Sequence, residues 1–197
     1  MDLDEKKRLN MITSSIVEGD RKTAAKEYAW FVKRYSREVI DFTSRMTNNR
    51  ADAEELSQNA FVKAFNNLQT FENRASFLTW ISRIAYNETL NHLRKQKHNF
   101  VNIDDTQIVD IEISDEDFST GNEERIQQLE QALELLPPDD KMLVHLYYYD
   151  DKPLKEIAFI MDLDANSLGV RLHRIRKKLL EMIKKNGKKS AKFMIFY

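Results

Sequence analysis

Residues 155–179 read KEIAFIMDLDANSLGVRLHRIRKKL, and they decide the fold of the C-terminal part of the chain. The apolar residues within 157–161 follow helical spacing, and residues 162–166, DLDAN, favour a turn and a helix cap. Asp164 stands where it can cap the helix that follows. A short apolar helix, a turn and a longer helix in this order predict a helix-turn-helix.

The second helix of this motif has an apolar side and a basic side. At 100° per residue, four apolar positions fall within a narrow arc, namely Leu168, Leu172, Ile175 and Leu179. The opposite side presents Asn166, Val170, His173, Arg174 and Lys177. Such a basic helix suits DNA, with cations beside phosphates and a few side chains at base edges. The alternatives for this segment alone are a solvated basic helix on an ordinary helical protein, or a helix that binds a membrane or a partner protein.

The composition indicates an all-helical protein without cysteine. The chain of 197 residues has only 4 glycines and 3 prolines, and it is long enough for two small domains. The absence of cysteine excludes a disulfide framework and a thiolate metal site, and it favours a cytoplasmic protein. No signal peptide or membrane-spanning run is visible, so direct membrane insertion is not expected.

Charge is strongly segregated along the chain, although the formal net charge is only −1. Residues 100–124 contain no lysine or arginine but nine acidic residues. This composition predicts a flexible acidic linker over 100–122, either a solvated spacer or a nucleic-acid mimic that occupies a basic groove. The stretch lacks the spacing and the glycine turn of a calcium loop, so neither a metal site nor another cofactor is expected.

The N-terminal 99 residues predict a set of helices. Helical periodicity and polar breaks place these helices at residues 2–17, 22–46, 52–68 and 77–94, with a loop at 69–76. Asp52, followed by Glu55 three residues later, resembles a capping box at the start of the third helix. Trp80 is expected to pack in the core, because large aromatic residues at helical spacing usually do. The neighbours expected for Trp80 are Phe61, Phe65 and Ile84.

Three blocks of the sequence together resemble a known family. The blocks are ADAEELSQNAFVKAF at 51–65, FLTWISRIAYNETLNHLRK at 77–95, and ALELLPPDDKMLVHLYYY at 132–149 followed by the helix-turn-helix. In this order they resemble the extracytoplasmic-function (ECF) sigma factors, the minimal sigma subunits of bacterial RNA polymerase. The resemblance covers nearly the whole chain outside the linker and the tail. It implies a non-catalytic specificity subunit that binds core polymerase and promoter DNA.

For the first block, the resemblance implies docking on the clamp of the beta-prime subunit of core polymerase. The residues that match the docking positions are Asp52, Glu55, Gln58 and Asn59. Glu55 replaces the usual aspartate, which is a conservative change. Capping and solvation are the alternative roles of these carboxylates. The beta flap is the second polymerase contact that the resemblance implies, and an anti-sigma factor is a further partner that it allows.

For the second block, the resemblance implies recognition of the minus-ten element. Promoter opening needs a pocket for unstacked bases, bordered by cations that hold the single strand. The matching residues are Asn73 and Arg74 in the loop, with Asn87, Asn91 and Arg94 in the helix that follows. Asn91 replaces a common aspartate and thereby removes a negative charge.

For the helix-turn-helix, the resemblance implies recognition of the minus-thirty-five element. The residues expected to face DNA are Asn166, Ser167, Val170, Arg171, His173 and Arg174, with Arg176, Lys177 and Lys178 beside phosphates. Asp162 stands where glycine is common, so it is expected to adopt a left-handed turn conformation. Gly169 replaces a frequent lysine and weakens the helix by about 1 kcal/mol relative to alanine.

The predicted organisation is a polymerase-docking and minus-ten domain at 1–99, the linker at 100–122, a helix-turn-helix domain at 123–185 and a basic and apolar tail at 186–197. The tail is either a plain chain end or a docking strip. Two alternative functions remain open. One is a regulator that binds duplex operators as a dimer without polymerase. The other is a degenerate sigma homologue that titrates polymerase or an anti-sigma partner. An enzyme is not expected, because no nucleophile-base pair, phosphate loop or metal-ligand spacing is visible.

Overall fold

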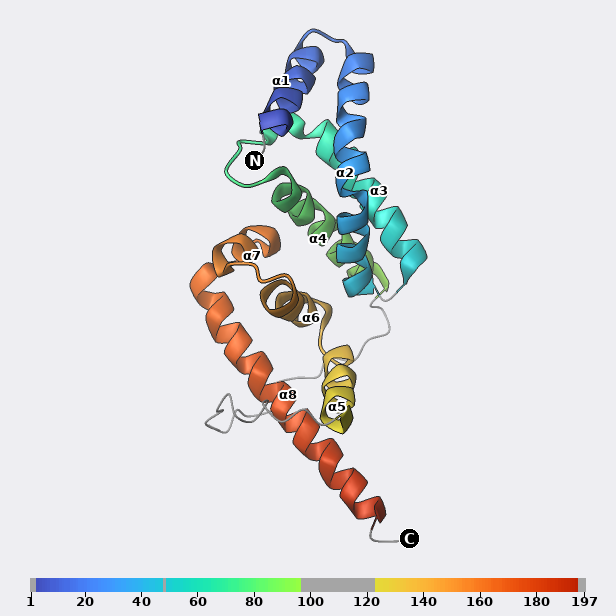
Figure 1. The fold of residues 1–197 in the computed structure, drawn as a ribbon, viewed down its shortest axis with the longest axis vertical. Helices are drawn as coiled ribbons and strands as arrows, with labels where there is room; N and C mark the ends of the chain where they lie inside the picture. The colour runs from blue at the N-terminus through green and yellow to red at the C-terminus, as the bar shows by residue number, and fades with distance from the viewer. Residues whose placement is uncertain (1–2, 48, 97–122, 195–197) are drawn as a thin grey trace. The chain divides into compact units, whose positions relative to one another are not determined.

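The computed structural model describes residues 3–47, 49–96 and 123–194. Every regular element in these ranges is a helix (Figure 1), which confirms the predicted all-helical class. The α-helices are α1 (Leu3–Val17), α2 (Arg21–Thr47), α3 (Arg50–Asn66), α4 (Phe77–Gln96), α5 (Glu123–Glu134), α6 (Pro138–Val144), α7 (Leu154–Met161) and α8 (Ala165–Met194). A short 3-10 helix, η1 (Leu68–Thr70), follows α3, and a π-helix, η4 (His145–Tyr149), follows α6. The predicted acidic linker lies outside the described residues.

The chain divides into two compact units. Unit 1 comprises Met1–Asn99 and Pro153–Leu163, and unit 2 comprises Phe100–Lys152 and Asp164–Tyr197. Helix α7 therefore groups with the N-terminal helices, whereas the domain boundaries predicted from the sequence kept it with α8. Helix α8 also runs to Met194, past the boundary predicted at residue 185.

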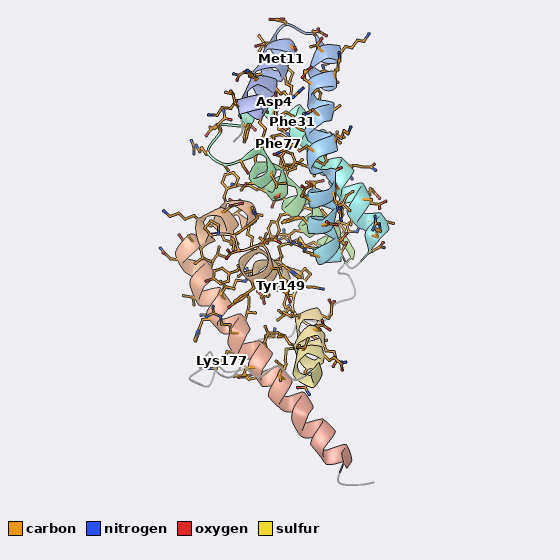
Figure 2. All side chains as sticks on the ribbon, viewed as in Figure 1. Asp4, Met11, Phe31, Phe77, Tyr149 and Lys177 are labelled. Carbon is orange, nitrogen blue, oxygen red and sulfur yellow. The ribbon has the colours of Figure 1, made fainter. Side chains whose placement is uncertain are left out.

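Unit 1 is built around α2, which packs against α1, α3 and α4. Phe31 of α2 and Phe77 of α4 are fully buried, and their ring centroids are 4.5 Å apart (both are labelled in Figure 2). The Tyr28 hydroxyl donates a hydrogen bond of 2.8 Å to the carbonyl oxygen of Phe61, which ties α2 to α3. Burial raises the pKa of the Tyr28 hydroxyl, so this group stays a protonated donor.

Helix α3 begins three residues earlier than the predicted capping box. Asn49 is its N-cap, and the side-chain oxygen of Asn49 accepts from the backbone N–H groups of Ala51 and Asp52. The prediction that Asp52 caps this helix is therefore wrong. Asparagine is as good an N-cap as aspartate. Asn49 bonds the free N–H groups at the start of α3, so Asp52 lies within the first helical turn.

The turn after α7 has the conformation expected from the sequence. Asp162 lies in the left-handed region, with φ 56° and ψ 45°, and ends α7 with a hydrogen bond from its N–H to the carbonyl of Ala158. Asp164 then caps α8, because its side-chain oxygen Oδ2 accepts from the N–H of Ser167 at 3.0 Å. Both predictions for this turn are confirmed.

In unit 2, α8 packs against α5 and α6. The four apolar residues predicted to share one side of α8 are all buried, namely Leu168, Leu172, Ile175 and Leu179. Arg171 fastens α8 to α6, because its Nε donates to Oδ1 of Asp140 at 2.7 Å. Oδ2 of Asp139 lies 3.9 Å from the guanidinium of the same arginine.

Candidate nucleic-acid and protein interfaces

One side of α3 is a continuous exposed stripe. Glu55, Gln58 and Asn59, all predicted to dock on polymerase, are exposed on this side. Val62 lies one turn beyond and is 61% exposed. Sequence reasoning missed Val62, although its spacing from Gln58 and Asn59 places it on the same side. The stripe (Glu55, Gln58, Asn59 and Val62) is thus polar with one apolar anchor.

Asp52, the fourth predicted docking residue, is half-buried at the edge of this stripe. Its Oδ2 lies 3.4 Å from Nε2 of His92 in α4. The carboxylate is therefore oriented by a side chain from the neighbouring helix. It is less accessible to a partner than Glu55 is.

The loop before α4 carries Asn73 and Arg74, as predicted, and both are exposed. Asn73 adopts a left-handed conformation with φ 59°, which asparagine tolerates better than most residues. The Nε of Arg74 forms an ion pair with Oε2 of Glu72 at 2.6 Å. The loop thus presents one amide and one partly neutralised guanidinium to solvent.

A cavity of about 280 Å³ opens between this loop and α4. Its lining consists of Thr70, Phe71, Glu72, Arg74, Ala75, Trp80, Arg83 and Phe159. Of the predicted minus-ten residues, only Arg74 is in this lining. The wall combines three aromatic rings with two guanidinium groups, which is the composition that binds stacked bases and phosphates.

Trp80 is a wall of this cavity rather than a core residue. Its side chain is half-buried, and its ring contacts are with Phe71, at 5.1 Å between centroids, and Phe77, at 5.9 Å. The prediction of a core role for Trp80 is therefore wrong, and its ring contacts are with Phe71 and Phe77 instead of the expected Phe61 and Phe65. A contact with Ile84 stays a prediction. The loop folds back so that Phe71 reaches Trp80, and this return of the chain has no signature in helical spacing.

Helix α4 presents one long polar side beyond the cavity. Asn87, Asn91 and Arg94, the predicted minus-ten residues of this helix, are all exposed, and their spacing places them on a single side. The same spacing continues back to Trp80 and Arg83 in the cavity wall. The structure therefore adds two residues to this side of α4, because Trp80 was predicted as a core residue and Arg83 was not among the predicted minus-ten residues.

The first turns of α8 expose most of the predicted minus-thirty-five residues. Asn166, Ser167, Val170, His173 and Arg174 are exposed, and Val170 is 54% exposed. The N–H and hydroxyl groups of Ser167 both bond to Asp164, so this serine also belongs to the helix cap.

Three of the residues predicted to contact DNA from α8 are less accessible than the prediction assumed. Arg171 is engaged by Asp140, as described above. Lys177 is only 4% exposed, so the expectation that it projects into solvent is wrong (it is labelled in Figure 2). Lys178 is half-buried. A helical wheel assumes that a helix packs on one side. In α8, Lys177 and Lys178 lie outside the predicted apolar side and yet are buried and half-buried.

Comparison with known proteins assigns both halves of the chain. Residues 31–99 match the family model "Sigma-70 region 2", and residues 126–179 match "Sigma-70, region 4". The ECF RNA polymerase sigma-E factor of Escherichia coli (strain K12) is 31% identical over 176 residues, which cover 82% of this chain and 89% of that protein. The chain belongs to the ECF sigma factors. The family recognised in the sequence is thereby confirmed.

A second relative of this ECF sigma factor is "ECF RNA polymerase sigma factor SigW" of Bacillus subtilis (strain 168). It is 28% identical over 167 residues, which cover 80% of this chain and 89% of that protein. Two solved structures share the fold. The sigma factor RpoE of Bartonella quintana, in complex with the anti-sigma factor NepR, has a TM-score of 0.56 at 21% identity and covers 81% of this chain and 98% of its own. CnrH, in complex with the cytosolic domain of CnrY, has a TM-score of 0.55 at 15% identity and covers 90% of this chain and 98% of its own.

Among the described residues of this sigma factor, no helix is long and apolar enough to cross a membrane.

Proposed function

We propose that this ECF sigma factor binds core RNA polymerase and directs transcription initiation at specific promoters, using three surfaces of its own. The observation that carries the proposal is that one chain matches both sigma-70 regions in order, within an alignment that spans most of a sigma factor. The protein itself catalyses no reaction in this proposal. It acts where polymerase acts, in the bacterial cytoplasm.

The α3 stripe of Glu55, Gln58, Asn59 and Val62 is the proposed docking surface for the beta-prime clamp. Its three polar side chains, Glu55, Gln58 and Asn59, are exposed and can be reached by a partner. The exposed Val62 offers the apolar contact that anchors of protein interfaces supply. Asp52 borders the stripe and is held in place by His92. The beta flap is the proposed partner of the second domain.

The cavity beside Trp80 is the proposed receptor for an unstacked promoter base. Phe71 and Trp80 offer ring faces, and base stacking on such faces is worth about 1–3 kcal/mol per base. Arg74 and Arg83 lie at the same cavity and can neutralise the phosphates next to that base. The strand would then run along Asn87, Asn91 and Arg94 on the exposed side of α4.

The first turns of α8 are the proposed reader of the minus-thirty-five element. Asn166, His173 and Arg174 can reach base edges or phosphates, and the exposed Val170 can contact a thymine methyl group. Ser167 and Lys178 are proposed phosphate contacts. Arg171 serves in this proposal mainly to orient α8 through Asp140. A phosphate contact by Lys177 would require its side chain to leave the buried position it occupies.

An anti-sigma factor is a further proposed partner, since the Bartonella quintana protein of similar fold forms a complex with one. The predicted acidic linker lies outside the described residues, and most of the predicted tail, residues 186–194, belongs to α8. A spacer or nucleic-acid mimic for the linker, and a plain chain end or docking strip for the tail, stay predictions.

Run-off transcription by purified core polymerase tests the proposal, on genomic fragments that include the region upstream of the gene itself. Discrete start sites that appear only with this protein are the expected result. Core binding without start sites would instead favour a titrating homologue. A shift of duplex DNA by the protein alone, with neither core binding nor initiation, would favour a regulator that acts without polymerase.

The docking surface is tested by Glu55→Lys, with Glu54→Lys as the matched control. Glu54 is the adjacent residue, points about 100° away and pairs with Arg50 at 2.9 Å. Glu55→Lys is expected to weaken core binding by about 10-fold, which corresponds to about 1.4 kcal/mol. The control should change binding little. Equal losses in both variants would contradict the assignment of this side of α3.

A further inference from the structure

The outer side of α2 carries a row of exposed cations. At about 100° per residue they fall within an arc of about 60°, which lies opposite the buried Phe42 and contains no acidic residue. From the first to the last they span about 22 Å of the helix, at 1.5 Å per residue. These cations, the basic row of α2, are Lys22, Lys26, Lys33 and Arg37, and all are exposed.

The basic row keeps most of its positive charge. Within the described part of the chain, no carboxylate forms an ion pair with Lys22, Lys26 or Lys33. The Nε of Arg37 lies 4.0 Å from Oδ2 of Asp41, but these side chains are 92% and 60% exposed, so water and salt screen the pair. The row is therefore a local concentration of cations in a chain whose formal net charge is only −1.

The stability of α2 does not explain these cations. Lys22 and Lys26 are four residues apart, as are Lys33 and Arg37, and like charges at this spacing destabilise a helix. The first turn of α2 holds Lys22 and no acidic residue, although the helix dipole favours anions at that end. A polyanion beside the helix would neutralise these charges and remove their mutual repulsion.

We propose that the basic row of α2 binds the sugar-phosphate backbone of promoter DNA when this sigma factor is on core polymerase. The inference rests on the proposed function, because it assumes that polymerase presents promoter DNA to unit 1. The row is a fourth surface, separate from the α3 stripe, the cavity side of α4 and the first turns of α8. Contacts to phosphates carry no direct sequence information, so the row adds affinity and not specificity.

The chemistry of the row fits phosphates better than an acidic protein surface. Duplex DNA carries one negative charge per about 1.7 Å of its axis, so about 13 phosphates accompany a helix segment of this length. Lysine binds a phosphate as a point charge, whereas arginine is preferred where carboxylates are bound in a bidentate manner. Three of the four cations are lysines. The residue between them on the outer side is Ala29, which is too small to be the apolar anchor of a protein interface.

The test variant is Lys26→Gln, Lys33→Gln, which removes the two central charges of the row. Its matched control is Lys6→Gln, Lys7→Gln, which removes the same charge from exposed positions of α1. Lys6 and Lys7 are adjacent, so their side chains point about 100° apart and do not form a row. Glutamine and lysine have similar helix propensities, so both variants should keep the Tm of the wild type.

The measurement is filter binding of the reconstituted holoenzyme to a promoter fragment, without nucleotides and over a series of salt concentrations. Run-off transcription with the wild-type protein supplies the fragment. Each phosphate contact that is lost should reduce the slope of log K against log salt by about 0.9, so the test variant should lose about 1.8. The control should keep the wild-type slope. An unchanged slope in the test variant would overturn the proposal.

Two further comparisons separate a phosphate contact from other roles of these lysines. Lys26→Arg, Lys33→Arg should restore the wild-type slope, because it keeps both charges, and a slope as low as that of the glutamine variant would contradict a contact made by charge. The glutamine variant should also lose the same slope on a fragment with an altered minus-ten element, since phosphate contacts do not depend on sequence. A loss confined to the unaltered fragment would contradict the proposal.

Core binding in the absence of DNA identifies the competing partner. The test variant should bind core polymerase as the wild type does, and a loss at this step would place an acidic surface of polymerase on the row instead of DNA. Run-off transcription separates the two levels of inference. Start sites with the wild-type protein and equal slopes for both proteins refute only the role of the row, whereas the absence of start sites refutes the proposed function and the role of the row with it.

Discussion

Replacing Gly169 with alanine is expected to stabilise the protein by about 1 kcal/mol, the difference in helix propensity between the two residues. Gly169 lies inside α8, where its backbone is not in the left-handed region, and an added Cβ meets no heavy atom within 4 Å. Alanine has fewer backbone conformations to lose on folding, so the change should help α8 without overlap or strain.

Thermal unfolding followed by circular dichroism measures this effect. A gain of about 1 kcal/mol raises Tm by about 4–8 °C if unit 2 melts separately, or by about 2–4 °C if the whole chain melts together. The urea midpoint should rise with an unchanged slope. An unchanged or lowered Tm would refute the reasoning, because it would mean that residue 169 is not in a regular helix in the folded protein.

Gly19→Ala is the matched control for this prediction, with the same added methyl group and the opposite sign. Gly19 also has open space around it, but its φ is +79°, which costs an alanine about 1–2 kcal/mol. The Tm of the Gly19→Ala variant should therefore fall. If Gly169→Ala raises Tm but weakens binding to a minus-thirty-five duplex, the glycine serves a close approach to DNA.

Two further predictions concern single hydrogen-bonding groups of unit 1. Tyr28→Phe leaves the buried carbonyl of Phe61 without the hydroxyl that donates to it, so it should lower the free energy of unfolding by about 1–3 kcal/mol in urea titration, whereas Tyr149→Phe, at an exposed position, should change it little. Hydrogen bonds from the hydroxyl and N–H of Thr23 lower the pKa of Asp20 below its usual value of 3.8. Stability from the ionised Asp20 is therefore present above the unfolded pKa and is lost as the pH falls through the folded pKa. Asp20→Asn should keep the cap of α2 and reduce the loss of stability below about pH 4, as measured by urea unfolding at several pH values. Identical acid profiles for the variant and wild type would contradict the Asp20 assignment.

Local features of the sequence were sufficient for most of the helices and for the turn after α7. Helical spacing predicted the buried side of α8, and the chemistry of Asp162 and Asp164 predicted a left-handed residue followed by a cap. Each of these outcomes depends on residues within about one helical turn of one another, so the signal is present in the sequence itself. The family could be recognised for a related reason, because its three blocks are local patterns in a definite order.

The start of α3 was misplaced although it is also local. Two capping candidates, Asn49 and Asp52, compete for the same N–H groups, and the sequence alone does not rank residues of similar capping strength. The polar docking residues on α3 could be predicted from the block that they match. Val62 was missed because a valine within such a block looks like a core residue until its exposure is known.

Only the tertiary structure shows which residues that are far apart in the sequence contact one another. Trp80 lines a cavity because Phe71 folds back onto it, and Arg171 is held by Asp140 on another helix. Arg83 meets Asp162, 79 positions further along the chain. Helical periodicity states which side of a helix is buried but not which segment buries it. That choice depends on the packing of surfaces remote in sequence, so the helices of this sigma factor were readable from its residues, whereas the cavity was not.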